Sequence, residues 1–121
     1  MPILLVALGG ALGAVARFLV STAFAQKLGS GWPWGTLFIN LSGCVLIALF
    51  LGAGTGRFAE GGLRYLLPVG FVGAYTTFST FEFETLRLIE LGRPASAVIY
   101  VAASNVLGLC AALLGAWIAR R

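Results

Sequence analysis

The chain has no histidine and no aspartate among its 121 residues, and only 10% of its residues carry a charge. The lack of histidine excludes histidine-based catalysis and most transition-metal sites. Ordinary globular domains contain about 25% charged residues. A soluble domain this short could not bury a composition that is 60% hydrophobic. The sequence therefore predicts an integral membrane protein that is not an enzyme, with lipid rather than nucleic acid as its surroundings.

Cysteine is also scarce. The two cysteines, Cys44 and Cys110, lie within apolar segments, and we expect them to be small buried apolar side chains rather than a disulfide or a redox pair. Glycine is abundant, with 17 residues, as expected where helices pack closely in lipid. Two pairs of small residues four positions apart predict such close contacts: Gly9 with Gly13, and Ala111 with Gly115.

Four apolar segments each reach the roughly 20 residues that a helix needs to cross a bilayer. They cover residues 3–24, 35–53, 63–91 and 95–119. The first is too long for a cleaved signal peptide and has no basic leader, and Pro94 suits the first turn of the fourth helix. No repeat or soluble domain is visible. We therefore expect an all-α protein in which residues 1–121 form a single domain of four transmembrane helices.

The basic residues give almost no orientation signal. The side that would hold both chain ends has four arginines, and the opposite side has three basic residues: Arg57, Arg64, Arg120 and Arg121 against Lys27, Arg87 and Arg93. So small a bias fits either a single orientation or insertion in both orientations, which would allow an antiparallel homodimer. Four helices of this size leave little room for a pore within one subunit, and this also favours an oligomer.

The stretch 73–81, GAYTTFSTF, places glycine, hydroxyls and aromatic rings inside the third apolar segment. Irregular or polar backbone at membrane depth survives only where protein or a water-filled path surrounds it. The stretch therefore predicts an ion pathway and a break in the third helix near residues 73–76. Its four hydroxyl residues could line a polar track or bond back to their own helix: Thr76, Thr77, Ser79 and Thr80.

Three side chains could meet an anion within the bilayer. Asn40 lies near the middle of the second segment, where its amide could make an interhelical hydrogen bond or donate to a permeating anion. Phe78 and Phe81 are three residues apart and share a helical face. Two such rings usually pack in a core, but their edges carry positive quadrupole charge and could solvate a small anion without holding it too tightly.

Other polar groups near this region leave alternatives open. Arg17 could reach the membrane surface or raise the anion concentration in an aqueous vestibule. Glu82 and Glu84 could be solvated or could pair with Arg87 or another arginine. If the third helix breaks, freed backbone carbonyls could coordinate a hard cation such as sodium, and two carbonyls per subunit near a two-fold axis would make a four-oxygen structural site.

Three motifs together resemble the Fluc fluoride channel family, also called CrcB-like proteins. They are GALGAVARF at 10–18, GTLFINLSG at 35–43 and GAYTTFSTFE at 73–82. The resemblance implies a multi-pass protein of the bacterial inner membrane that passively exports fluoride from the cytoplasm and so protects against fluoride toxicity. It also implies a dual-topology homodimer with two antiparallel pores and a structural sodium ion at the dimer interface.

The resemblance further implies roles for single residues. Asn40 matches the pore asparagine, and Phe78 and Phe81 match two phenylalanines whose edges face fluoride. Gly73 and Thr76 match the positions whose backbone carbonyls hold sodium.

Other matches concern the polar lining of the pathway. Arg17 matches an arginine near the vestibule, and Tyr100 and Ser104 resemble a polar face of the fourth helix. Thr77, Ser79 and Thr80 match the family's polar pore region. One position departs from the pattern, because Gly108 stands where a further hydroxyl is expected.

Three other classes of function compete with a channel. The first is a small proton-coupled exporter, either a fluoride/proton exchanger or a multidrug-type transporter. A multidrug exporter needs a carboxylate on its first helix, and this segment has Arg17 and no acid. The second is a structural subunit of a larger membrane complex. An intramembrane enzyme is the weakest alternative, because no nucleophile–base pair is visible.

Overall fold

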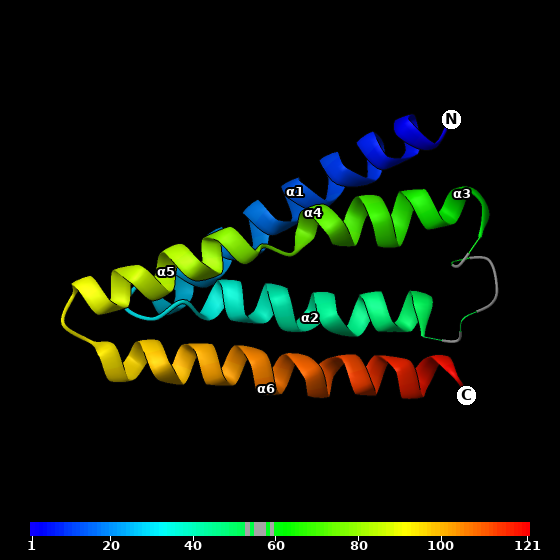
Figure 1. Ribbon diagram of the computed structural model, residues 1–121. Coiled ribbons are helices and arrows are strands. Elements are labelled where there is room, and N and C mark those ends of the chain that lie inside the picture. The colour runs from blue at the N-terminus through cyan, green and yellow to red at the C-terminus, as the bar shows by residue number, and fades with distance from the viewer. Residues whose placement is uncertain (53, 55–57, 59) are drawn as a thin grey trace.

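The computed structural model describes residues 1–52, 54, 58 and 60–121, which form helices and no strands (Figure 1). The elements in chain order are α1 (Pro2–Leu28), α2 (Trp34–Leu51), α3 (Gly61–Arg64), the π-helix η1 (Tyr65–Val72), α4 (Gly73–Tyr75), α5 (Phe78–Glu90) and α6 (Pro94–Ala119). Among the described residues, three helices are long and apolar enough to cross a membrane: α1, α2 and α6. An all-helical membrane protein is thus confirmed, and Pro94 is in the first turn of α6 as expected.

The third apolar segment is not one continuous helix. Pro68 lies inside η1, where it has no amide N–H to bond the preceding turn, so the regular α-helical pattern of hydrogen bonds cannot continue through it. After α4 ends at Tyr75, Thr76 and Thr77 have extended backbone angles, with ψ of 156° and 115°. Helix α5 then starts at Phe78, with the Thr77 side chain accepting a hydrogen bond from the Thr80 amide as its N-cap.

The helices pack as two close pairs, α1 against η1 and α2 against α6 (Figure 1). The predicted small residues lie at both contacts. A Cβ atom at Gly13 would collide with the carbonyl oxygen of Phe71, and one at Gly115 would collide with the carbonyl oxygen of Val45. The absence of a side chain at these positions lets the backbones approach closely, so the packing role predicted for the glycines is confirmed.

Both chain ends lie at one end of the molecule, and the α1–α2 and α5–α6 connections lie at the other (Figure 1). Arg64, Arg120 and Arg121 belong to the first end. Arg57, which we also assigned to it, lies outside the described residues.

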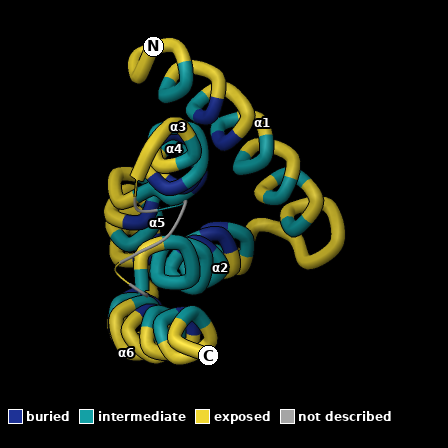
Figure 2. Tube along the Cα trace, turned by 90° about the vertical axis from the view of Figure 1, so that its right-hand side faces the viewer, coloured by how far each residue is buried: buried dark blue, intermediate teal, exposed yellow. Residues whose placement is uncertain are grey.

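The outward faces of the helices are exposed (Figure 2), and many large apolar side chains are among the exposed residues. The cysteines are free of disulfide bonds. We expected both side chains to be buried. Cys44 is half-buried, but the prediction is wrong for Cys110, which is exposed on the outer face of α6.

Candidate functional site

Asn40 of α2 is bonded to the extended residue Thr77 through both ends of its amide. Its Nδ2 donates to the Thr77 carbonyl oxygen at 3.1 Å, and its Oδ1 accepts from the Thr77 amide at 2.9 Å. In an uninterrupted helix the Thr77 amide would donate to the carbonyl of Gly73 instead. Asn40 thus replaces the helical partner of Thr77, and one N–H of its NH₂ group is not used by this pair. Of its two predicted roles, the interhelical hydrogen bond is present.

Arg17 of α1 stabilises the same interruption from another side. Its Nε donates to the carbonyl oxygen of Ala74 at 3.1 Å. In an uninterrupted helix that carbonyl would accept from the amide of Phe78, which is instead the first residue of α5. The guanidinium therefore bonds inside the protein. It also lines a cavity of about 260 Å³ together with seven other residues: Phe18, Ser21, Thr22, Thr36, Ile39, Thr77 and Thr80.

A second cavity, of about 350 Å³, lies beside the interruption and brings together six of the predicted site residues: Asn40, Gly73, Thr76, Thr77, Phe78 and Phe81. The rings of Phe78 and Phe81 are 6.0 Å apart with an interplanar angle of 57°. They differ sharply in exposure, since Phe81 is 7% exposed and Phe78 is 74% exposed. The two rings therefore share a face, as predicted. In a single chain the Phe81 ring is buried and the Phe78 ring is exposed.

The hydroxyls of this region make local hydrogen bonds. Thr76 Oγ1 donates to the Val72 carbonyl at 3.0 Å, one turn earlier in the chain. Thr77 Oγ1 donates to Thr80 Oγ1 at 3.0 Å. Ser79 is exposed and lines neither cavity. Of the two alternatives for these hydroxyls, local hydrogen bonds within their own segment are present. Thr77 and Thr80 also line the cavity of Arg17.

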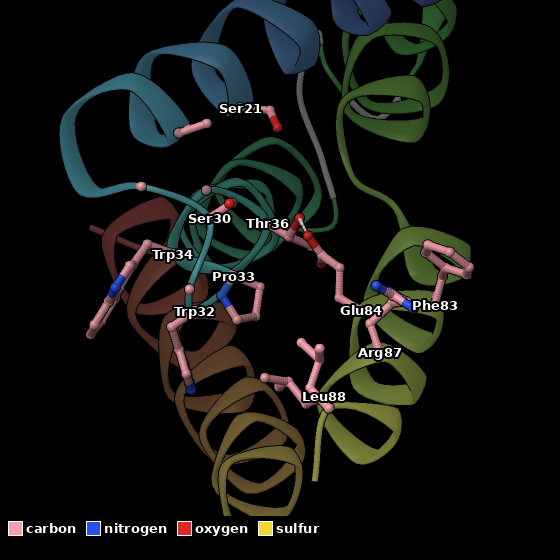
Figure 3. A pocket seen from close by; sticks show the side chains of 15 residues that line it. Ser21, Ser30, Trp32, Pro33, Trp34, Thr36, Phe83, Glu84, Arg87 and Leu88 are labelled. Atoms are coloured by element: carbon pink, nitrogen blue, oxygen red, sulfur yellow. Dashed lines mark hydrogen bonds between the residues drawn. The ribbon is translucent and has the colours of Figure 1, made fainter. Parts of the chain in front are cut away.

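Glu84 of α5 is the centre of a polar network that joins three helices. Its Oε1 accepts from the Tyr100 hydroxyl of α6 at 2.8 Å, and its Oε2 accepts from Thr36 Oγ1 of α2 at 3.0 Å (Figure 3 shows the latter). Of the alternatives left open for Glu84, pairing with Arg87 is not the one present, because Arg87 bonds Glu90, one turn along the same helix, at 3.3 Å. Two neutral hydroxyls thus bond the carboxylate in place of an arginine.

Thr36 was not identified as a candidate from the sequence. It lies four residues before Asn40, so the two share a face of α2. This spacing was the available signal.

The chain is similar to known proteins along nearly its whole length. The family model for "CrcB-like protein, Camphor Resistance (CrcB)" matches residues 4–116. The chain belongs to the CrcB-like family. Similar proteins include one from Nitrobacter winogradskyi, 50% identical over 98% of this chain and 94% of its own, and one from Acidobacterium capsulatum, 46% identical over 100% and 98%. A protein from Thermus thermophilus is 44% identical over 93% and 90%. All three are named "Fluoride-specific ion channel FluC".

Family membership and three helices long and apolar enough to span a membrane make this CrcB-like chain a multi-pass bacterial membrane protein. Its predicted fourth-helix residues differ in position. Tyr100 is fully buried, at 0% exposure, and its ring lies 5.0 Å from that of Phe81. Ser104 is half-buried and lines neither cavity described above. Gly108 is buried, and a Cβ atom there would lie 3.7 Å from Cys44 Sγ, which is ordinary contact.

The third cavity of this CrcB-like chain, about 360 Å³, lies between the α1–α2 connection and α5 (Figure 3). Its walls include Trp32, Glu84 and Arg87. Ser21 and Thr36 line both this cavity and the cavity of Arg17. Polar side chains thus continue from the end of the molecule that holds the connections to the interruption between α4 and α5.

Proposed function

We propose that this chain forms a passive fluoride channel that exports fluoride from the bacterial cytoplasm and so protects the cell against fluoride toxicity. The observation that carries the proposal is the helix interruption at Thr76 and Thr77, with Asn40, Phe78 and Phe81 lining one cavity beside it. The names of the relatives, which are fluoride-specific ion channels, supply the identity of the ion.

The chemistry of this cavity suits a small anion. The N–H of Asn40 that Thr77 does not use is a donor, and the edges of Phe78 and Phe81 carry positive quadrupole charge. Neither group has a full charge, so both can replace part of the water shell of fluoride without trapping the ion. A narrow path of this kind would disfavour the larger chloride ion. For the wider pathway we propose a polar lining of Thr77, Ser79, Thr80, Tyr100 and Ser104. Of these, Thr77 and Thr80 line the cavity of Arg17, whereas the other three line neither that cavity nor the one with Asn40. Arg17 would attract anions to the vestibule.

The driving force for export is electrical. Hydrogen fluoride crosses membranes as a neutral molecule and dissociates at near-neutral pH, which leaves a trapped anion inside the cell. An inside-negative potential favours exit of that anion by about 2.3 kcal/mol per 100 mV. A channel therefore needs no coupled proton, and the Glu84 network can be structural.

We further propose that the whole chain is one transmembrane domain, in which η1, α4 and α5 cross the membrane as a broken third span, and that two copies associate in opposite orientations. Phe78 lines the cavity with Asn40, and its side chain is exposed in a single chain. A second copy would cover this side chain and complete the path. Two antiparallel pores per dimer follow from that arrangement.

Two backbone carbonyl oxygens, those of Gly73 and Thr76, support our proposal of a structural sodium ion at the dimer interface. The Gly73 carbonyl lacks its usual partner because the Thr77 amide bonds Asn40, and the extended ψ of Thr76 turns its carbonyl out of the helical direction. Carbonyl oxygens are the ligands that hard cations prefer. Within the described part of the chain, no group of three or more His, Cys, Asp and Glu side chains could hold a metal. Two oxygens per chain require a second copy to make a complete site.

Removal of sodium is expected to weaken the dimer. Purified protein would be exchanged into a buffer in which a bulky organic cation replaces sodium, and its oligomeric state would be measured by size exclusion with light scattering. We expect a larger monomer fraction and lower fluoride flux, both restored when sodium is returned. An unchanged dimer and unchanged flux after complete exchange would contradict the sodium proposal.

The test of function is fluoride efflux from liposomes that contain the purified protein, with a potassium ionophore to release the voltage and chloride as the comparison ion. Rapid fluoride efflux without a pH gradient, and much slower chloride efflux, is the expected result. Efflux that requires an imposed proton gradient would instead establish a fluoride/proton exchanger. No flux from verified, folded dimers would contradict the channel and favour a structural subunit.

A further inference from the structure

Trp32 lies in the connection between α1 and α2, at one end of the molecule. Its half-buried indole is 5.2 Å from the ring of Tyr100 at an interplanar angle of 71°. The ring of Tyr100 is in turn 5.0 Å from Phe81 at 69°, and Phe81 is 6.0 Å from Phe78. Four aromatic rings therefore form a continuous row from the connection to the helix interruption.

The contacts in this row set ring orientation. Near-perpendicular pairs such as Trp32–Tyr100 and Tyr100–Phe81 have edge-to-face geometry, which is favourable beyond the area that it buries. Tyr100 cannot turn freely, because it is fully buried and its hydroxyl donates to Glu84. The indole of Trp32 covers the Tyr100 ring and packs against the same buried cluster that contains Phe81. A change in Trp32 would therefore loosen the ring that holds Phe81.

Trp32 is held from two directions. The guanidinium of Arg93, in the α5–α6 connection, donates to the carbonyl oxygen of the neighbouring Gly31 at 2.5 Å. The ring of Trp34 lies 4.5 Å from that of Trp32. Trp32 also lines the third cavity together with Glu84 and Thr36 (Figure 3). It is thus both a wall of that cavity and the end of the aromatic row.

We propose that Trp32 is a positioning residue of the ion pathway. By packing on Tyr100 it fixes the ring of Phe81, and thereby the ring edge that a passing anion meets. This inference rests on the proposed function, in which Phe81 contacts fluoride. Trp32 itself does not contact the ion beside the interruption. Its effect is therefore on the orientation of the Phe81 ring, and it does not donate a hydrogen bond to the ion.

The experiment compares three variants of the full chain in the liposome efflux assay, with fluoride and chloride measured separately. Trp32→Leu removes the aromatic face, and we expect fluoride flux to fall about three- to tenfold, on the scale of one lost aromatic pair. The fluoride-to-chloride ratio should fall with it, which a general loss of folded protein would not cause. Trp32→Phe keeps a ring and should retain most of the flux. Trp117→Leu removes an exposed indole at the opposite end and should match the wild type.

The outcomes separate this inference from the function on which it rests. A wild-type protein without fluoride flux would overturn the proposed function. A conducting wild type with an unchanged Trp32→Leu variant would overturn only the role of Trp32. Equal losses in Trp32→Phe and Trp32→Leu would also overturn it, because ring packing would then not be the cause.

If Trp32→Leu fails to fold, tryptophan fluorescence tests the positioning role instead. The variant with Trp34→Phe and Trp117→Phe leaves Trp32 as the single tryptophan of the chain, which has three. We expect a saturable change in the emission of Trp32 when fluoride is added and none when chloride is added. An ion bound beside Phe81 would shift the packing of the row of rings that ends at Trp32. No fluoride-dependent change in a conducting protein would overturn the positioning role.

Discussion

Exchange of Asn40 for aspartate is expected to reduce fluoride efflux by at least about 100-fold. The carboxylate can still accept from the Thr77 amide, but its second oxygen would face the Thr77 carbonyl, where Asn40 now donates. The unused N–H is lost as well. The new charge also repels an anion, by about 4 kcal/mol at 4 Å for an effective dielectric constant of 20, and each 1.4 kcal/mol is about tenfold in rate. The measurement is efflux from liposomes at matched protein content.

Asn40→Ala separates the effect of the added charge from the loss of the amide's hydrogen bonds. It introduces no charge, but it leaves the amide and the carbonyl of Thr77 without their partners, at about 1–3 kcal/mol for each buried unsatisfied group. We expect it to be less stable than the wild type and poorly conducting. An aspartate variant that folds, forms dimers and conducts within tenfold of the wild type would remove Asn40 from the ion pathway.

The second large effect is expected at Gly13, where α1 meets η1 and α4. A Cβ atom there would collide with the Phe71 carbonyl oxygen and would lie 3.1 Å from the Tyr75 amide nitrogen. These are backbone atoms, so the clash is relieved only if α1 moves away. Overpacking of this kind costs about 1–3 kcal/mol even where side chains can adjust. We expect Gly13→Ala to lower the thermal unfolding midpoint markedly and Gly13→Val to yield no folded protein, as measured by circular dichroism and size exclusion.

Gly10 provides the matched control three residues earlier on the same helix. A Cβ atom at Gly10 would have its nearest neighbours, the Ala74 Cβ and the Gly70 carbonyl oxygen, at 3.9 Å, which is ordinary contact. Alanine also favours a helix over glycine by about 1 kcal/mol. Gly10→Ala should therefore match or exceed the wild type in stability. Equal behaviour of Gly10→Ala and Gly13→Ala would show that the close approach of α1 does not limit packing.

The helices could be predicted because the composition and length of an apolar segment nearly determine its structure in lipid. Spacing also predicted correctly that Phe78 and Phe81 share a face, since residues three apart on a helix do so regardless of tertiary contacts. Residue type at membrane depth also indicated an interhelical hydrogen bond by Asn40, and its amide does bond Thr77. Each of these conclusions depends on local sequence or on the solvent alone.

The partners of the polar residues could not be predicted in the same way. Glu84 was expected to be solvated or paired with arginine, yet it bonds Thr36 and Tyr100 from two other helices. That arrangement depends on the relative height and rotation of α2, α5 and α6, which no local pattern specifies. Likewise, Asn40 could be read as a polar group in need of partners, but only the packed structure places it opposite Thr77.

The bonds of Arg17 and Asn40 to the interruption have a consequence for its dynamics. Ala74 and Thr77 are three residues apart and are held from α1 and α2, by side chains 57 and 37 positions away in the sequence. Loosening this segment would therefore require both helices to withdraw, so its fluctuations should follow the opening of the whole bundle rather than the fraying of a helix end. We therefore expect the interruption at Thr76 and Thr77 to be protected from hydrogen exchange about as well as the helices that flank it. Under the proposed function, such stiffness would let neutral groups select an ion by size, because the walls of the path would not adjust to a larger one.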